Sequence, residues 1–180
     1  MWKSYALAAL CGLAIAACAT TNPSPSGQAQ IERQAANTIA DMEYKQPQIR
    51  AILQNAYAYA VFPSIGKGGF IVGGAYGKGV LYEQGRPTGF VDMKQASLGA
   101  QIGGQTFAEL VVLPNPAAVQ RLKAGQLSLG ADISAVVFTI GSQGAAQLTG
   151  NETVFVMPHG GLMAGVSVTG QQISYLSSAG

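Results

Sequence analysis

The distribution of glycine constrains the fold of this chain more than any other feature of its sequence. Of its 24 glycines, 22 follow residue 60, and from Tyr57 onward apolar residues alternate with small or polar ones. A period of two is typical of β-strands, because successive side chains point to opposite faces. Glycine inside a strand allows a bend or the close approach of another backbone. The sequence therefore predicts a curved, mainly antiparallel, glycine-rich β-sheet, barrel-like or sandwich-like.

The longest alternating run lies between residues 98 and 112. One of its faces carries apolar and small residues, and the other, which includes Gln101, Gln105 and Glu109, is predicted to be the wetter face. Similar runs predict strands at residues 70–76, 80–83, 133–140, 153–157, 162–169 and 173–176. Turn residues separate them, for example at Gln84-Gly85 and Thr169-Gly170.

Helical periodicity precedes the strands. Ile31, Ala35, Ile39 and Met42 recur at helical spacing and predict a short amphipathic helix. A second short helix is predicted from Pro47, at a first-turn position, to Ala56, with Ile49, Ile52 and Leu53 on its apolar stripe.

A third helix interrupts the strands. Asn115 can cap it, Pro116 fits its first turn, Val119 and Leu122 supply an apolar stripe, and Gly125 can stop it. The expected fold class is thus α+β, with short N-terminal helices packed on the curved sheet.

The N-terminus has the pattern of a lipoprotein signal. Lys3 precedes the apolar run at residues 5–17, which is too short to span a bilayer, and residues 15–18 read IAAC. We expect a signal peptide at 1–17, acylation of Cys18 with groups such as palmitate, an acylated disordered tether at 18–27 and one domain at 28–180. The alternative is an ordinary secretory signal with a chance cysteine. In a Gram-negative cell, the absence of aspartate after Cys18 predicts the periplasmic face of the outer membrane.

Cysteine content and charge exclude several classes of protein. Cys11 would leave with the signal and Cys18 would be acylated, so no disulfide is expected. The ten Lys and Arg less Lys3, against eight Asp and Glu, leave a formal net charge of +1. The chain has no basic stripe, so no nucleic-acid partner is predicted.

Motifs for catalysis or cofactor binding are absent from the sequence. The glycines around Lys78 lack the spacing and the Ser or Thr of a phosphate-binding loop, and no Gly-x-Ser-x-Gly motif surrounds Ser167. His159 is the single histidine, and it lies in a Pro-His-Gly-Gly turn without cysteine partners. We therefore expect no enzymatic activity, no cofactor and no metal.

Four basic residues are candidates for contact with anionic lipid. Lys67 and Lys78 lie between glycines in segments expected to be flexible loops, with Arg86 and Lys94 nearby in the sequence. The alternative for Lys67 and Lys78 is that they are exposed loop lysines that keep the protein soluble. Basic residues of the N-terminal helices, Arg33, Lys45 and Arg50, are a second candidate for head-group contact. The aromatic residues Tyr57, Tyr59, Phe62, Phe70 and Tyr76 are expected in the core.

Five glycine-rich segments resemble the signature of the SYLF domain family. They are residues 58–70 (AYAVFPSIGKGGF), 73–81 (GGAYGKGVL), 99–105 (GAQIGGQ), 129–132 (LGAD) and 161–167 (GLMAGVS). The resemblance covers roughly residues 30 to 176. It implies a membrane-binding module: eukaryotic members associate with phosphoinositides and cortical actin, and bacterial members are often small envelope lipoproteins.

Two segments depart from the family pattern. After Asp132 the family runs into a small-residue Gly-Pro stretch, where this chain has VVFTIG at 136–141. Before Gly161 it shows serine with a basic residue, where this chain has MPHG at 157–160.

These observations together predict a membrane-anchored envelope lipoprotein of the bacterial branch that binds lipid or anionic phospholipid surfaces without catalysis. The alternative is a structural or protein-interaction module of the cell envelope that uses the lipid only as an anchor and engages an envelope protein partner.

Overall fold

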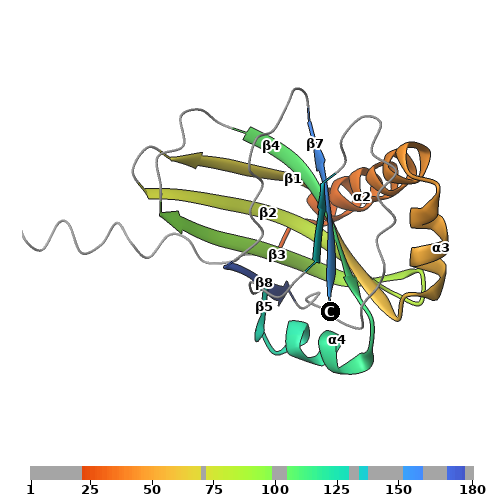
Figure 1. Ribbon diagram of the computed structural model, residues 1–180. Helices are drawn as coiled ribbons and strands as arrows, with labels where there is room; N and C mark the ends of the chain where they lie inside the picture. The colour runs from red at the N-terminus through yellow and green to blue at the C-terminus, as the bar shows by residue number, and fades with distance from the viewer. Residues whose placement is uncertain are drawn as a thin grey trace, which may run out of the picture.

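The computed structural model describes residues 22–69, 72–98, 105–129, 134–137, 152–159 and 170–176. Within them, eight strands form one sheet in the order β5-β8-β3-β2-β1-β4-β7-β6, and three helices pack against it (Figure 1). All neighbouring strands are antiparallel except the parallel pair β6 and β7. The α+β prediction is confirmed. Of the two predicted sheet forms, barrel-like and sandwich-like, the single curled sheet corresponds to the barrel-like one. The strands are β1 (Ala58–Gly69), β2 (Val72–Glu83), β3 (Arg86–Leu98), β4 (Gln105–Leu113), β5 (Leu127–Leu129), β6 (Ser134–Val137), β7 (Thr153–Pro158) and β8 (Gln171–Leu176).

A bulge in the central strand β1 contributes to the bend of the sheet. The register with β2 shifts between Val61 and Ser64, and the register with β4 shifts between Phe62 and Ile65. Pro63 lies inside the bulge and has no partner in either ladder, which is where a central strand tolerates proline. The imidazole Nε2 of His159 lies 2.8 Å from the Pro63 carbonyl oxygen, so the single histidine supports the bulge.

Helix α2 (Pro25–Lys45) is longer than the short helix that the sequence predicts. Ser24 caps it by accepting a hydrogen bond from the Gly27 amide at 3.4 Å, and proline occupies the first turn. The helix thus begins three residues before Gln28, the expected start of the domain. Ala35, Thr38 and Met42 form its buried face.

The two shorter helices lie where the sequence predicts them. Helix α3 (Gln48–Asn55) follows Pro47 and buries Ile49 and Leu53. Helix α4 (Pro116–Lys123) is capped by Asn115, whose side-chain oxygen accepts from the Ala118 amide at 3.0 Å. Gly125 ends it with a φ of 68°, a conformation that glycine adopts without strain.

Both faces of the sheet are buried near the helices. On the face that we call the outer face, α2 and α3 pack with residues such as Tyr59, Leu110 and Phe155. On the opposite, inner face, α4 packs with residues such as Phe62 and Phe107. Because α4 and the short edge strand β5 enclose this inner side, strand residues that would be wet in a flat sheet are buried here.

The enclosed inner face overturns one prediction. Glu109 was expected on the wetter side of its strand, but its side chain is 0% exposed, between the buried Phe107 and Val111. The run between residues 98 and 112 also belongs to two strands, since β3 ends at Leu98 and β4 begins at Gln105. Residues 1–21, with Cys18, and the predicted strand at 162–169 lie outside the described residues.

Candidate functional site

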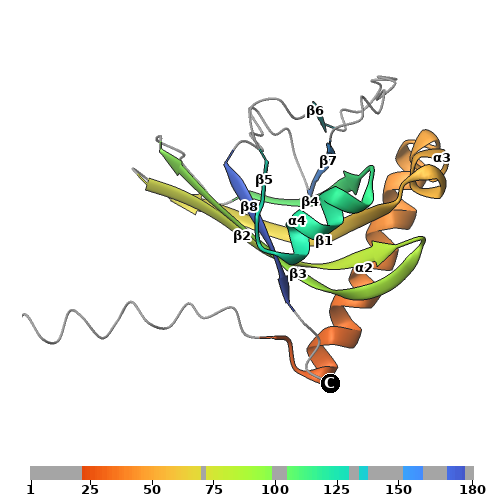
Figure 2. The same ribbon diagram turned by 90° about the horizontal axis from the view of Figure 1, so that it is seen from below.

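The outer face divides into a covered half and an uncovered half. Helices α2 and α3 cover the half that carries Tyr59 and Tyr82. Strands β1, β2 and β3 continue well beyond these helices, to the left in Figure 1, and Figure 2 shows the same strand ends projecting away from all three helices. We call the uncovered half the open face. Its residues are Ser64, Gly66, Gly74, Tyr76, Lys78 and Lys94.

Tyr76 lies at the centre of the open face. It pairs with Gly66 on β1 and with Lys94 on β3, so the lysine is its direct cross-strand neighbour. Lys78 lies two residues further along β2, on the same side as Tyr76 because side chains alternate. The Tyr76 side chain is 44% exposed, and among the described residues it and Tyr44 are the exposed large hydrophobic side chains.

Glycines keep the surface beside the Tyr76 ring low. A Cβ built at Gly66 would meet no atom within 4 Å, so this side of the ring is open space. Gly74, two residues before Tyr76 on β2, is exposed as well. A flat object can therefore approach the tyrosine and its two lysines without meeting another large side chain on these positions.

A buried carboxylate lies beneath the lysines. Asp92 pairs with Lys78 across the β2–β3 ladder, and its Oδ2 lies 3.8 Å from Lys94 Nζ. Burial raises the pKa of Asp92, and Lys94 and Lys78 oppose this shift. When Asp92 is ionised, the two lysines still outnumber it, and the open face has a net charge of +1.

The four basic residues predicted as one lipid site do not meet. Lys78 and Lys94 share the open face, whereas Arg86 pairs with Glu83 at the other end of the hairpin, roughly 26 Å along β3 from Lys94 at 3.3 Å per residue. Lys67 pairs with Ala75 and Gln105. Lys67 and Lys78 lie within strands β1 and β2, so the prediction that both occupy flexible loops is wrong.

Sequence reasoning missed Tyr76 and Asp92. Tyr76 was expected in the core, and its exposure corrects that prediction. The sequence did contain a signal. Gly74, Tyr76 and Lys78 lie on the same face of their strand, and a face that carries a glycine and a lysine offers little apolar side-chain volume for a core. The sequence could not show where α2 and α3 pack on the sheet, and so could not show that this half of the outer face stays uncovered.

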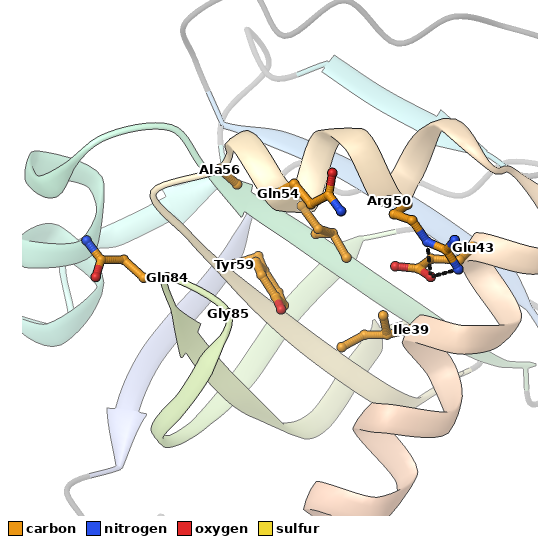
Figure 3. A pocket seen from close by; sticks show the side chains of 9 residues that line it. Ile39, Glu43, Arg50, Gln54, Ala56, Tyr59, Gln84 and Gly85 are labelled. Carbon is orange, nitrogen blue, oxygen red and sulfur yellow. Dashed lines mark hydrogen bonds and ion pairs between the residues drawn. The ribbon is translucent and has the colours of Figure 1, made fainter.

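A cavity of about 500 Å³ lies between α2, α3 and the turn that joins β2 to β3. Figure 3 shows Tyr59 between the Glu43–Arg50 pair on one side and the Gln84-Gly85 turn on the other. Arg50 Nε and Nη2 donate to Glu43 Oε2 at 3.2 and 3.1 Å. Ile39 and Leu53 form an apolar part of the cavity lining. The cavity therefore combines apolar side chains with the Glu43–Arg50 ion pair, which has no net charge.

The Tyr59 phenol in the cavity is not poised for acid-base chemistry near neutral pH. Burial, with a smaller effect of Glu43, raises the pKa of Tyr59, so its phenol stays protonated near neutral pH. Tyr59 stacks on Tyr82 with ring centroids 5.0 Å apart, which fits a packing role. The part of the chain that the structure describes contains no cluster of three or more His, Cys, Asp or Glu side chains suited to a metal ion.

None of the helices in the described ranges combines the length and apolar character needed to cross a membrane. Comparison with curated proteins yields no match. A comparison with protein families does: residues 94–179 match the Ysc84 family, described as Las17-binding protein actin regulator. The matched segment includes Lys94 of the open face and strands β4 to β8.

The family match and the glycine-rich segments before it agree. Residues 58–81, which resemble the SYLF signature, include β1 and most of β2, and the matched residues run from Lys94 in β3 to beyond the end of β8. Over residues 94–179 the chain matches the Ysc84 model of the SYLF domain family, and this match supports the SYLF family as the one to which this part of the chain is similar.

Proposed function

We propose that this chain is a lipid-anchored protein of the cell envelope whose domain binds anionic membrane surfaces through the open face, without catalysing a reaction. The observation that carries the proposal is the half-exposed Tyr76 ring with Lys94 directly across the ladder and Lys78 beside it. Tyrosine favours the boundary between head groups and acyl chains, and lysine favours the anionic surface just outside it.

The expected affinity of the open face alone is low. A lysine near an anionic surface contributes about 1 kcal/mol, so the two lysines together contribute about 2 kcal/mol. A dissociation constant of 1 mM already requires about 4 kcal/mol. The open face therefore reaches roughly millimolar affinity only with the contribution of the Tyr76 ring, which flotation with millimolar lipid can detect, and it needs a second attachment to hold the domain at a membrane in the cell.

Acylation of Cys18 would supply that second attachment. The N-cap residue Ser24 lies six positions after Cys18, a reach of at most about 22 Å when the chain is fully extended. A domain held this close to the bilayer meets it at an effective concentration on the order of millimolar, which suits a weak contact. The proposed location is the periplasmic face of the outer membrane.

A protein partner is the alternative occupant of the open face. The matched family is described by the binding of Las17, so its proteins include ones that bind another protein. In that case the same tyrosine and lysines would contact an envelope protein, and the acyl groups would serve only as an anchor.

Vesicle flotation separates the two functions. A chain that begins at Ala19, and so lacks the anchor, should float with anionic vesicles more than with neutral ones, and less as salt screens the lysines. Lys78→Glu with Lys94→Glu should lower this binding by up to about a thousandfold. Each reversal removes about 1 kcal/mol of attraction and adds about 1 kcal/mol of repulsion, so the two together change the binding free energy by about 4 kcal/mol.

The matched control carries the same change in net charge elsewhere. Arg33→Glu with Arg86→Glu alters two exposed basic residues away from the open face and should leave most of the binding in place. Equal loss in both double variants would mean that overall charge, not the open face, governs binding. A parent chain that floats with no vesicle would favour the protein-interaction module.

A further inference from the structure

The inner face of the sheet holds a polar pair that the proposed function does not use. Glu109 lies in the middle of β4, where it pairs with Phe62 on β1 and Val156 on β7. Gln171 is the first residue of β8 and pairs with Gln95 on β3. Both side chains are 0% exposed.

The two residues meet across the inside of the curl. In the sheet order, β8 and β4 are separated by β3, β2 and β1, so no ladder hydrogen bond joins them. Gln171 Nε2 nevertheless donates to Glu109 Oε2 at 2.9 Å. This side-chain bond therefore ties one flank of the curled sheet to the other, beneath α4, which packs against β4, β5 and β8.

Among the described side chains, none beside Glu109 offers a compensating charge. The described inner face around Glu109 carries apolar side chains of β1, β3, β5, β7 and α4, together with the buried, uncharged amide of Gln95, which pairs with Gln171 in the β3–β8 ladder. The described charged groups on this side are two ion pairs of α4, Lys123 with Glu83 and Arg121 with Glu152, and each pair is neutral in itself. The phenol of Tyr175 donates to the Thr88 carbonyl oxygen instead.

When Glu109 is ionised, the Glu109–Gln171 pair has more buried acceptor atoms than hydrogen-bond donors. Within the described part of the chain, neither Glu109 Oε1 nor Gln171 Oε1 has a hydrogen-bond partner. A buried acceptor without a donor is unfavourable, and an ionised carboxylate is the worst case. A proton on Glu109 removes the charge and supplies the missing donor. Burial raises the pKa of Glu109 to about 7, although the bond from Gln171 opposes the shift.

We propose that Glu109 and Gln171 form a proton-dependent latch that ties β8 to β4 across the inside of the sheet, closed while the carboxyl group is neutral and loosened when it ionises. The ligand of this site is a proton, and the moving part is β8 with its short neighbour β5. The latch is independent of the proposed membrane contact, although β8 also pairs with β3 at Lys94.

The direction of the pH effect follows from the two pKa values. In an opened state Glu109 regains its ordinary value of 4.5, while in the closed state the pKa is about 7. Below a pH of 4.5 Glu109 is protonated in both states, and the latch keeps its full preference for the closed state. Between the two values opening releases a proton, so opening increases by up to about tenfold per pH unit, and above the higher value the effect levels off.

Hydrogen exchange of the β8 amides tests the latch. In the full chain, held in detergent micelles, protection of residues 171–176, corrected for intrinsic exchange, should fall by up to about a hundredfold between about pH 5 and pH 7 and then level off. Glu109→Gln, which has nearly the shape of the neutral acid, should fold and keep its protection constant over this range.

A second variant distinguishes a titrating latch from a merely structural bond. Gln171→Met removes the donor that lowers the pKa of Glu109, so the fall in protection should continue to higher pH than in the parent chain. Asp41→Asn, which changes an exposed carboxylate on α2, should reproduce the parent profile. Constant protection in the parent chain, or a pH dependence that survives in Glu109→Gln, would overturn the proposal.

Discussion

Replacing Gly79 with alanine is expected to destabilise the domain by about 3 kcal/mol or more, at the upper end of the range for overpacking. Gly79 lies on β2 opposite the β1 bulge, where an added Cβ would overlap the backbone oxygen of Val61 and lie 2.8 Å from Phe62 Cδ1. Neither group can move freely, because Val61 belongs to the ladder and Phe62 is fully buried. Urea unfolding of the anchor-free chain measures the loss.

Gly66→Ala is the matched control for this prediction. The position also lies in a strand of the same sheet, but a Cβ there meets no atom within 4 Å, so the change should leave the unfolding free energy the same or slightly higher. If the two alanine variants have equal stability, the close approach of β2 to the β1 bulge does not constrain the fold.

Replacing Cys18 with alanine is expected to have the largest effect on location. The change removes the only thiol that could carry the acyl groups at the predicted cleavage site. Each buried CH₂ contributes about 0.8 kcal/mol to membrane binding, so the loss of several acyl chains lowers the partition coefficient by many orders of magnitude. The variant should appear in the soluble periplasmic fraction or remain as precursor, without fatty-acid label.

Cys11→Ala serves as the control, because this cysteine lies inside the predicted signal segment and should be dispensable for acylation. Membrane fractionation and fatty-acid labelling that stay unchanged in Cys18→Ala would refute the lipoprotein proposal. That outcome would leave the fold, and the geometry of the open face, untouched.

Local signals made the helices predictable. Asn115, Pro116 and Gly125 bracket α4 because each residue type fits one backbone position at a helix end. The turn at Gln84-Gly85 was likewise predictable, since both residues adopt positive φ. The full length of α2 was not, because its first two turns carry no buried residue that would extend the apolar stripe.

Long-range pairing explains what the sequence could not predict. Strand β1 contains Pro63, which argues against a central strand, and only the bulge opposite β2 and β4 accommodates it. Glu109 reads as a solvent-facing residue of an alternating strand until the sheet curls and α4 closes over the inner face. Both features depend on contacts between residues far apart in the chain.

The candidate site was predicted only in part for the same reason. Lys78 and Lys94 were identified by residue type, but strand register decides that they are neighbours and that Arg86 is not. Tyr76 looked like a core residue because its sequence neighbours are apolar or small. Its exposure follows from α2 and α3 covering only one half of the outer face.

The claim that the open face meets the membrane can be tested by asking which surface of the domain touches lipid. In chains that begin at Ala19 and so contain no other cysteine, Ser64→Cys places a label on the open face, beside Lys78 in the ladder. Ala117→Cys places the same label on the exposed side of α4, which packs on the inner face.

With an environment-sensitive fluorophore and anionic vesicles that contain a lipid-borne quencher, we expect a blue shift and quenching at Ser64→Cys and no change at Ala117→Cys. The signal at Ser64→Cys should vanish when Lys78 and Lys94 are also changed to Glu. An unchanged label at Ser64→Cys on a protein that floats with the vesicles, or a shift at Ala117→Cys alone, would contradict the account.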